Sequence, residues 1–249
     1  MRAFGAGVAN EFSKLIARKK YIVFLCIGAA ICCLWALIGN LITSAVSGMA
    51  VIGRSKPMEL LHFFLQVLVP FLMFMGVTDL FTVEAADSTM KASLIRPVER
   101  WKLYTAKLCA VMIYAAGYLI SIFIISSLLQ IAFGGMEPIG SLLISFVSYL
   151  LVLIPLAVLC CFASLIALFG RSGTLVMFLL ILSYLLLCVL PFAFPVLSEL
   201  LFTSYLGWYR LFVGALPSFA SLSNKLLIVL GYGTVFFTAG SLVFDRKEY

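Results

Sequence analysis

The stretch EAADSTMKASLIRPVERWKLYTAK, residues 84–107, is the longest well-charged segment of a chain that is otherwise almost entirely apolar. Of the 249 residues, 64% are hydrophobic and 11% are charged, whereas soluble domains carry about 25% charged residues. This composition indicates an integral membrane protein. The charged stretch therefore interrupts a series of membrane spans, with two apolar runs before it and four after it.

The residues before the charged stretch predict an amphipathic helix and two spans. Residues 1–20 place apolar side chains on one helical face and charged ones on the other, namely Val8, Phe12, Leu15 and Ile16 against Glu11, Lys14, Arg18 and Lys19. This pattern suits an elbow helix on an anionic membrane surface; the alternative is a basic tail that only sets topology. Spans 1 and 2 are predicted at about 21–46 and 59–80, each long enough to cross a bilayer.

The residues after the charged stretch predict four more spans, at about 104–133, 141–169, 174–195 and 226–244. Together with the first two they form one six-span domain over residues 21–249. Pro70 and Pro155 lie inside spans 2 and 4 and are expected to kink them. Residues 197–225 mix aromatic side chains with sparse charge, which favours interfacial or re-entrant helices over an ordinary external loop with an aromatic belt.

The distribution of lysine and arginine predicts the orientation, because these residues accumulate in cytoplasmic loops. With both termini in the cytoplasm, 13 of the 17 basic residues lie inside and four outside, the four being Arg54, Lys56, Arg210 and Lys225. The net charge of +7 follows from this rule. Because the basic residues are scattered at span ends, no nucleic-acid partner is expected.

Chemistry inside the membrane is not indicated. His62, one turn into span 2 beside Glu59, is the only histidine, and the seven cysteines lie in apolar runs without a CxxC pair. Metal sites need several such donors together, so neither a metal nor a directly bound cofactor is expected. The phosphate-binding motif GxxxxGK[ST] is also missing from the sequence, and ATP and Mg²⁺ would have to be bound by a partner ATPase subunit.

The charged stretch itself reads as a short helix, a break and a second helix. Residues 84–95 favour a helix, Arg96-Pro97 ends it because the residue before a proline avoids helical angles, and residues 99–107 start the helix that leads into span 3. A helix this short is marginal alone and would gain by docking into a groove of a soluble partner. The alternative is a solvated loop, which explains the charges but not the order of elements.

The order of residues in this stretch resembles the first cytoplasmic loop of bacterial ABC-2-type permeases. In that family a pattern of the form E-x-x-x-G-T-L-K-x-L-L-x-R-P-x-x-R-x-x-x-x-x-x-K joins spans 2 and 3. Ser88 replaces the usual Gly and Met90 the usual Leu; outside residues 79–107 the resemblance is one of layout. The matching residues are Asp79, Glu84, Ser88, Thr89, Met90, Lys91, Leu94, Arg96, Pro97, Arg100 and Lys107.

The resemblance implies the permease subunit of an ATP-binding cassette exporter in the bacterial cytoplasmic membrane, similar to permeases for bacitracin, lantibiotic or other antimicrobial-peptide export and immunity. It implies a pairing with a second permease copy or a homologous permease, and with an ATP-binding subunit that docks on the coupling helix 84–95. The implied ATPase-coupling residues are Glu84, Asp87, Ser88, Thr89, Lys91, Leu94, Arg96, Pro97 and Arg100. Spans 1, 2 and 5 would line the pathway, with residues 197–225 as the outer gate. The candidate pathway residues are His62, Gln130, Tyr205 and Trp208.

Two other classes of function stay open at this point. A non-transport membrane protein, such as an assembly factor, a sensor or an immunity protein, would need no ATPase. An intramembrane enzyme would need a reactive centre, for which His62 is the only candidate. The few charges inside the spans favour an amphipathic or hydrophobic substrate over a free ion.

Overall fold

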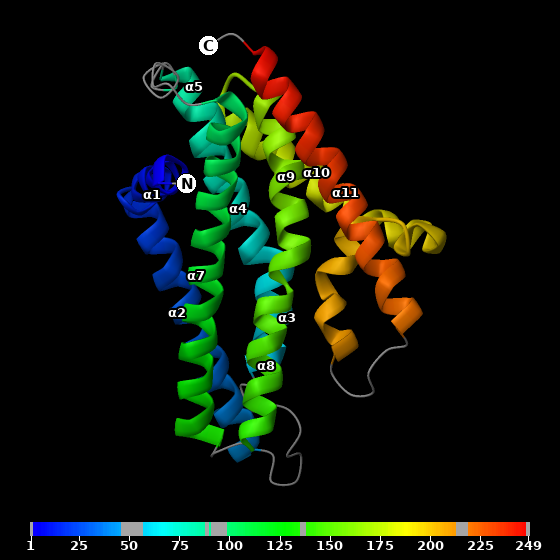
Figure 1. Ribbon diagram of the computed structural model, residues 1–249. Coiled ribbons are helices and arrows are strands. Elements are labelled where there is room, and N and C mark those ends of the chain that lie inside the picture. Colours follow the sequence, from blue (N-terminus) through cyan, green and yellow to red (C-terminus); the bar gives the residue numbers. More distant parts are fainter. Residues whose placement is uncertain are drawn as a thin grey trace.

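The computed structural model describes residues 2–45, 57–87, 90, 99–134, 138–212 and 219–247. Within these ranges every regular element is helical, and six helical segments are long and apolar enough to cross a membrane. The prediction of an all-α protein with six spans is thereby confirmed. Figure 1 shows an elongated bundle with both chain ends toward one end of it. We call this the proximal end and the opposite one the distal end.

The first half of the chain forms a short crossing helix and two spans. These are α1 (Arg2–Ile16), α2 (Lys19–Ala45) and span 2, which consists of α3 (Pro57–Phe63), η1 (Phe64–Leu68), α4 (Val69–Val77), η2 (Thr78–Val83) and α5 (Glu84–Ala86). The backbone angles stay helical across the junctions of span 2, so it is one long helix with two π-helical segments. One of these segments lies directly before Pro70, where a wider turn accommodates the missing donor.

The second half contains the other four spans. Span 3 is α7 (Arg100–Gly134), span 4 combines α8 (Ile139–Leu151) and α9 (Leu153–Phe169), span 5 is α10 (Gly173–Ala193), and span 6 is α11 (Phe219–Arg246). Span 4 is interrupted at Val152, one turn before Pro155, whose ring disfavours a straight helix at this point. Two short 3-10 helices, η3 (Pro195–Ser198) and η4 (Phe202–Phe212), connect α10 to α11.

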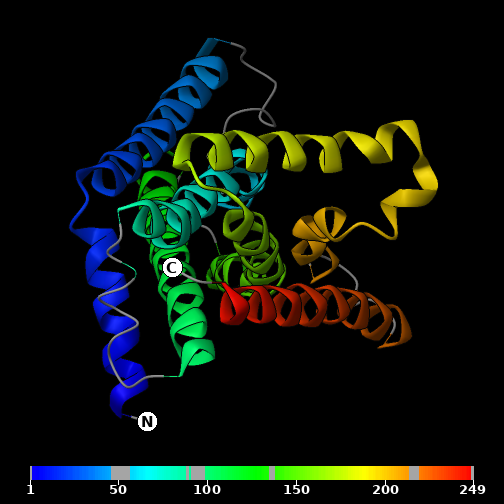
Figure 2. The same ribbon diagram turned by 90° about the horizontal axis from the view of Figure 1, so that it is seen from above.

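Span 2 lies at the centre of the bundle, and spans 5 and 6 lie at its margin. In its most apolar window 61% of span 2 is buried, against 17% for α10 and 11% for α11. Figure 2, the view from above, shows α10 and α11 running outward from the other helices. At the proximal end the ring of Phe81 in span 2 contacts Tyr104 of α7 and Phe244 of α11, at centroid distances of 5.6 and 6.1 Å.

Three prolines within the spans each remove the donor that would normally reach the carbonyl four residues earlier. A buried carbonyl needs another partner, and in each case a side chain from a different element supplies it. The bonds run from Tyr184 Oη to Gln66 O (3.0 Å, before Pro70), from Trp208 Nε1 to Leu151 O (2.9 Å, before Pro155) and from Thr203 Oγ1 to Leu187 O (3.3 Å, before Pro191). Two of the three donors belong to η4, which is thereby attached to spans 4 and 5.

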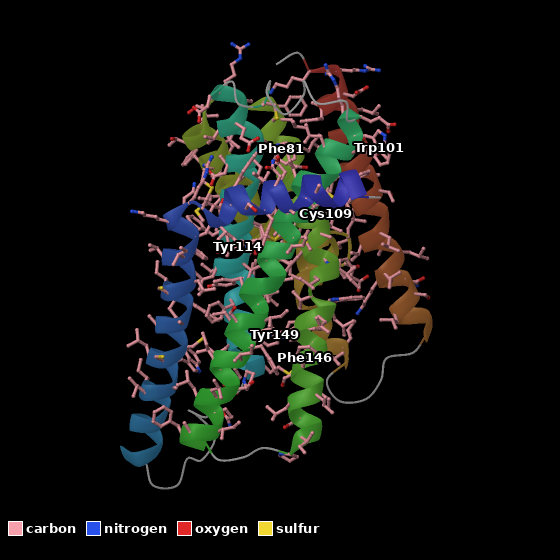
Figure 3. All side chains as sticks on the ribbon, turned by 60° about the vertical axis from the view of Figure 1, so that its left-hand side comes forward. Phe81, Trp101, Cys109, Tyr114, Phe146 and Tyr149 are labelled. Atoms are coloured by element: carbon pink, nitrogen blue, oxygen red, sulfur yellow. The ribbon has the colours of Figure 1, made fainter. Side chains whose placement is uncertain are left out.

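The first helix, α1, lies across the bundle and packs against α7; Figure 3 shows the crossing near Cys109. Its apolar face is only partly covered, since Leu15 is fully buried whereas Ile16 is 45% exposed. Glu11, which the sequence places on the charged face of this helix, is buried to 2% exposure. The reason is that the charged face of α1 is turned toward charged partners on α5 and α7. That α1 rests on the membrane surface stays a prediction.

Candidate functional site

Four charged side chains at the proximal end, three of them buried and Lys14 partly exposed, form a ring that we call the elbow cluster: Glu11, Lys14, Glu84 and Lys107. Lys107 Nζ lies 2.9 Å from Glu11 Oε2 and 2.6 Å from Glu84 Oε2. Lys14 Nζ lies 2.7 Å from Glu11 Oε1 and 3.1 Å from Glu84 Oε1. Each ammonium group therefore bridges both carboxylates, and the cluster joins α1, the end of span 2 and α7.

The elbow cluster is neutral as a whole, which makes the burial of its charges tolerable. Lys107 is fully buried, and a buried ion pair is retained only with several good contacts. Burial raises the pKa of Glu11, but the ammonium groups of Lys107 and Lys14 outweigh it and hold this pKa below its ordinary value. Burial likewise lowers the pKa of Lys14, and Glu11 and Glu84 outweigh it and raise the value. Glu11 and Lys14 are thus held charged at neutral pH.

A second set of contacts surrounds Asp79, one helical turn before Glu84 on span 2. Its carboxylate accepts from Tyr21 Oη at 2.7 Å and lies 2.9 Å from Arg18 Nη1 and 2.6 Å from Lys20 Nζ. Arg18 and Lys20 belong to the junction of α1 and α2, so this Asp79 cluster fixes the bend between the crossing helix and span 1. With two cations, Arg18 and Lys20, around one carboxylate, the Asp79 cluster has a formal net charge of +1.

The predicted coupling residues divide into two groups in the structure. Glu84 continues the helix of span 2, so the expectation that it begins a separate helix was wrong, and Asp87 ends that helix. Arg100 begins α7 and donates from Nη1 to the carbonyls of Asp245 and Lys247, at 2.7 and 3.1 Å, at the end of α11. Ser88, Thr89, Lys91, Leu94, Arg96 and Pro97 lie outside the described residues, and the coupling role of the whole set stays a prediction.

Span 2 and α10 face each other along a crevice that holds a cavity at either end. The proximal cavity has a volume of about 820 Å³ and also reaches Lys20 of α2. Its charged and hydroxyl-bearing lining consists of Lys20, Thr78, Asp79, Arg171, Ser172 and Thr174, and its apolar lining includes Met75, Met177, Phe178 and Ile181. Spans 1, 2 and 5, expected to line a pathway, are the three spans that form this cavity.

The distal cavity has a volume of about 470 Å³ and lies between span 2, α10 and η4. His62 and Gln66 line it, with their Nε2 atoms 3.1 Å apart, and Arg210 of η4 adds a positive charge. On α10 the two cavities are one turn apart, between Ile181 and Tyr184. Tyr184 is bonded to Gln66 O and packs edge-on against the ring of Phe74 at 5.7 Å, which closes the crevice between them.

The other candidate pathway residues lie away from this crevice. Tyr205 and Trp208 line a cavity of about 600 Å³ on the other side of η4, which shares Arg210 with the distal cavity. Gln130 is buried in α7 and lines neither cavity of the crevice. Of the four candidates, only His62 thus belongs to the crevice. Within the described parts of the chain, no three His, Cys, Asp or Glu side chains are grouped as metal ligands.

Six membrane spans, two of which face each other along a crevice with a cavity at either end, have the form of a membrane permease. Residues 8–185, well over half of the chain, match the family model described as "ABC-2 family transporter protein". The chain belongs to this ABC-2 transporter family, whose members are membrane transport components that generally work with an ATP-binding subunit. No curated protein matches the chain.

Proposed function

We propose that the chain is the permease subunit of an ATP-driven exporter and that its crevice between span 2 and α10 is the transport pathway. The observation that carries this proposal is the pair of cavities on the same two helices, separated at Tyr184. A transporter that alternates its access needs a closure between two such spaces. The positive-inside rule puts the proximal cavity in the cytoplasm and the distal cavity outside.

Energy would enter through residues 88–98, which connect two anchored positions. On one side Glu84 is tied by ion pairs to α1 and α7; on the other, Arg100 is tied by hydrogen bonds to the end of α11. A partner ATPase that binds ATP and Mg²⁺ and displaces this loop would therefore move α1, span 2, α7 and α11 together. A second permease, identical or homologous, would complete the pathway on the side of α10.

The lining of the crevice supports an amphipathic substrate. Both cavities combine charged or polar groups with apolar walls that reach the lipid-facing surface, where Phe178 and Phe192 are 64% and 88% exposed. A molecule with a polar part and an apolar part could occupy such a space without losing contact with the bilayer. An antimicrobial peptide satisfies this description, and its export is part of the proposal.

The proposal is tested by labelling a cysteine in each cavity. Cys188 lines the distal cavity, and Thr174→Cys places a thiol in the proximal one; each is kept as the only cysteine of its variant. In the reconstituted complex with the cognate ATPase, trapping with ATP and vanadate is expected to change maleimide labelling at the two positions in opposite directions. Equal labelling with and without nucleotide, at both positions, would overturn the pathway.

The coupling role of residues 88–98 is tested in the same preparation. Thr89→Pro should abolish the nucleotide-dependent change while the ATPase still hydrolyses ATP and the chain stays in the membrane, because proline prevents a regular helix at this point. The matched control is Glu99→Ala, since the polar contacts of the Glu99 side chain within the described residues are to its neighbours Trp101 and Lys102. A normal response in Thr89→Pro would contradict the coupling role.

A further inference from the structure

The 3-10 helix η4 leaves one of its three faces uncovered. Such a helix has three residues per turn, so side chains three positions apart lie in one straight row along it. Ser204, Gly207 and Arg210 form a row of this kind and are at least partly exposed, whereas the two residues between each pair of them are buried. We call these three residues the exposed row. Arg210 supplies its one large side chain.

The two buried faces of η4 line different cavities. Tyr205 and Trp208 share one face and line the cavity of about 600 Å³, which we call the outer cavity. Thr203 and Leu206 share the other face and line the distal cavity of about 470 Å³. All three members of the exposed row line both cavities. The helix is thus a partition between two spaces, and these spaces meet along the exposed row.

Two hydrogen bonds hold η4 in this rotation. Thr203 donates to Leu187 O of α10, and Trp208 donates to Leu151 O of span 4. The two donors belong to different buried faces, so a turn of η4 about its axis would break at least one of these bonds. The bonds therefore keep the exposed row at the junction of the two cavities.

Gly207, in the middle of the exposed row, lowers the partition. Glycine inside a helix is destabilising relative to alanine, so its presence calls for a reason. The two usual reasons do not apply, because the backbone of Gly207 is not left-handed and an added Cβ would meet no atom of the described residues within 4 Å. The missing side chain instead leaves open space where the distal and outer cavities meet.

Arg210 makes this junction positive. It lines both cavities, and among the described residues it forms no ion pair, although Glu199 lines the outer cavity as well. Lys225 adds a second cation on the side of the outer cavity. A fixed charge beside a confined aqueous space raises the local concentration of ions of the opposite sign. The junction should therefore admit acidic groups more readily than basic ones.

We propose that substrate leaves the distal cavity across the exposed row of η4 and enters the outer cavity, with Gly207 keeping this passage open and Arg210 setting its charge preference. The inference rests on the proposed function and deepens it, because it gives the exit route and favours amphipathic substrates that carry an acidic group. It is tested without any ATPase or nucleotide. A passage that is present without a nucleotide response would remove the transport and keep the passage, and the reverse result would remove the passage alone.

The experiment measures how fast Cys188, which lines the distal cavity and is kept as the only cysteine, reacts with a thiol reagent added outside intact cells. The reagent is methanethiosulfonate ethylsulfonate, an anion that does not cross membranes. Gly207→Trp should slow the reaction roughly tenfold, because the indole fills the space above the exposed row, whereas Gly207→Ala should leave the rate nearly unchanged. A graded effect of side-chain size indicates obstruction, and equal thermal stability of the two variants excludes unfolding.

The matched control is Gly231→Trp on α11. An added Cβ at Gly231 also meets no atom of the described residues within 4 Å, but this glycine lines neither the distal nor the outer cavity. Its substitution should leave the rate at Cys188 unchanged. The same rate in Gly207→Trp and Gly231→Trp would overturn the passage, and so would a Cys188 that does not react from outside in the chain with Gly207.

The charge preference is measured with a second reagent, the cation methanethiosulfonate ethyltrimethylammonium. Each rate at Cys188 is divided by the rate of the same reagent with a small free thiol. The anionic reagent should then react severalfold faster than the cationic one, and Arg210→Gln should remove most of this difference. A ratio that is the same with Arg210 and with Gln at this position would overturn the role of Arg210.

Discussion

The two ends of the bundle are held together by different chemistry. At the proximal end, the elbow cluster and the Asp79 cluster join α1, α2, span 2 and α7 through charged groups with several partners each. At the distal end, η4 is attached to spans 4 and 5 by two single hydrogen bonds, each to the carbonyl four residues before a proline. The proximal end is thus held by networks of ion pairs, whereas the distal hydrogen bonds of η4 are neutral and act beside the packing of the Phe202 ring on Phe162 and Phe236.

This difference predicts how each end responds to a force. Removing one partner of a buried ion pair costs about 3–5 kcal/mol, whereas a neutral hydrogen bond contributes about 0.5–1.5 kcal/mol. The proximal end should therefore move as one body, and the distal end should rearrange locally. If a partner displaced residues 88–98, the proximal end would then move with them as a unit, and the distal end, where the distal cavity lies, would rearrange.

The largest expected effect comes from Lys107→Met. The substitution removes the fully buried ammonium group and leaves Glu11 and Glu84 facing each other with only Lys14 between them. We expect the free energy of unfolding to fall by about 3–5 kcal/mol, measured by denaturant titration of the purified chain in detergent. Lys102→Met on the same helix is the matched control. Among the described residues, Lys102 forms an ion pair with exposed Glu99 and lies over the exposed ring of Trp101, so its loss should have little effect.

A double variant distinguishes the charge from the packing of Lys107. Glu84→Gln combined with Lys107→Met leaves one carboxylate and one ammonium group in the ring and should recover part of the loss. Should the two substitutions simply add their costs, the elbow cluster would not act as one unit, and the contrast between the two ends would weaken accordingly.

The sequence was sufficient to predict the six spans, because long charge-free runs set them apart. It did not give the end of span 2, whose helix runs from Pro57 to Ala86 and includes Asp79 and Glu84. It was not sufficient to predict the elbow cluster. The helical periodicity of residues 1–20 puts Glu11 with the polar residues, and that much is correct. Burial of this polar face depends on Glu84 and Lys107, which reach it only through the tertiary packing of α1 on α7.

The candidate pathway residues could likewise be predicted from the sequence only where they stand out without their partners. His62 could be singled out as the only histidine, and it lines the distal cavity. Tyr184 could not, because a tyrosine in an apolar run is ordinary until its partner is known. A signal for Tyr184 did exist: Pro70 predicts that the carbonyl of Gln66 needs another donor, although the sequence does not say which side chain supplies it.

An intermediate effect is expected from Trp208→Phe at the distal end. The variant keeps an aromatic ring but loses the donor to Leu151 O, for an expected loss of about 1 kcal/mol. Pro155→Ala restores a backbone N–H that can reach the same carbonyl. In the Pro155→Ala background, Trp208→Phe should therefore cost less, measured as the coupling energy of a double-mutant cycle. If the two substitutions together cost the sum of their separate effects, Leu151 O is not an acceptor shared by Trp208 Nε1 and the backbone N–H of residue 155.

The smallest effect, and the finest test of the comparison, is the pH dependence of the proximal end. The pKa of Glu11 is lowered in the folded chain. The stabilisation that its carboxylate gives to the folded state is therefore complete above the ordinary glutamate pKa, and it is lost as the pH falls through the pKa that Glu11 has in the folded chain. The pKa of Lys14 is raised in the folded chain. The stabilisation that its ammonium group gives to the folded state is therefore present at low and neutral pH, and it is lost only as the pH rises through a pKa above the ordinary lysine value.

The stability contributed by the elbow cluster should accordingly be flat from about pH 5 to pH 10, between the ordinary values of the two residue types. Below that range, melting temperatures should decline less steeply in Glu11→Gln than in the unmodified chain, because the variant has no proton to take up at this position. Trp208→Phe should keep the full acid dependence, since the distal bond that it removes is neutral. The same slope in Glu11→Gln as in the unmodified chain would mean that the ion pairs of Glu11 contribute nothing to the rigidity of the proximal end.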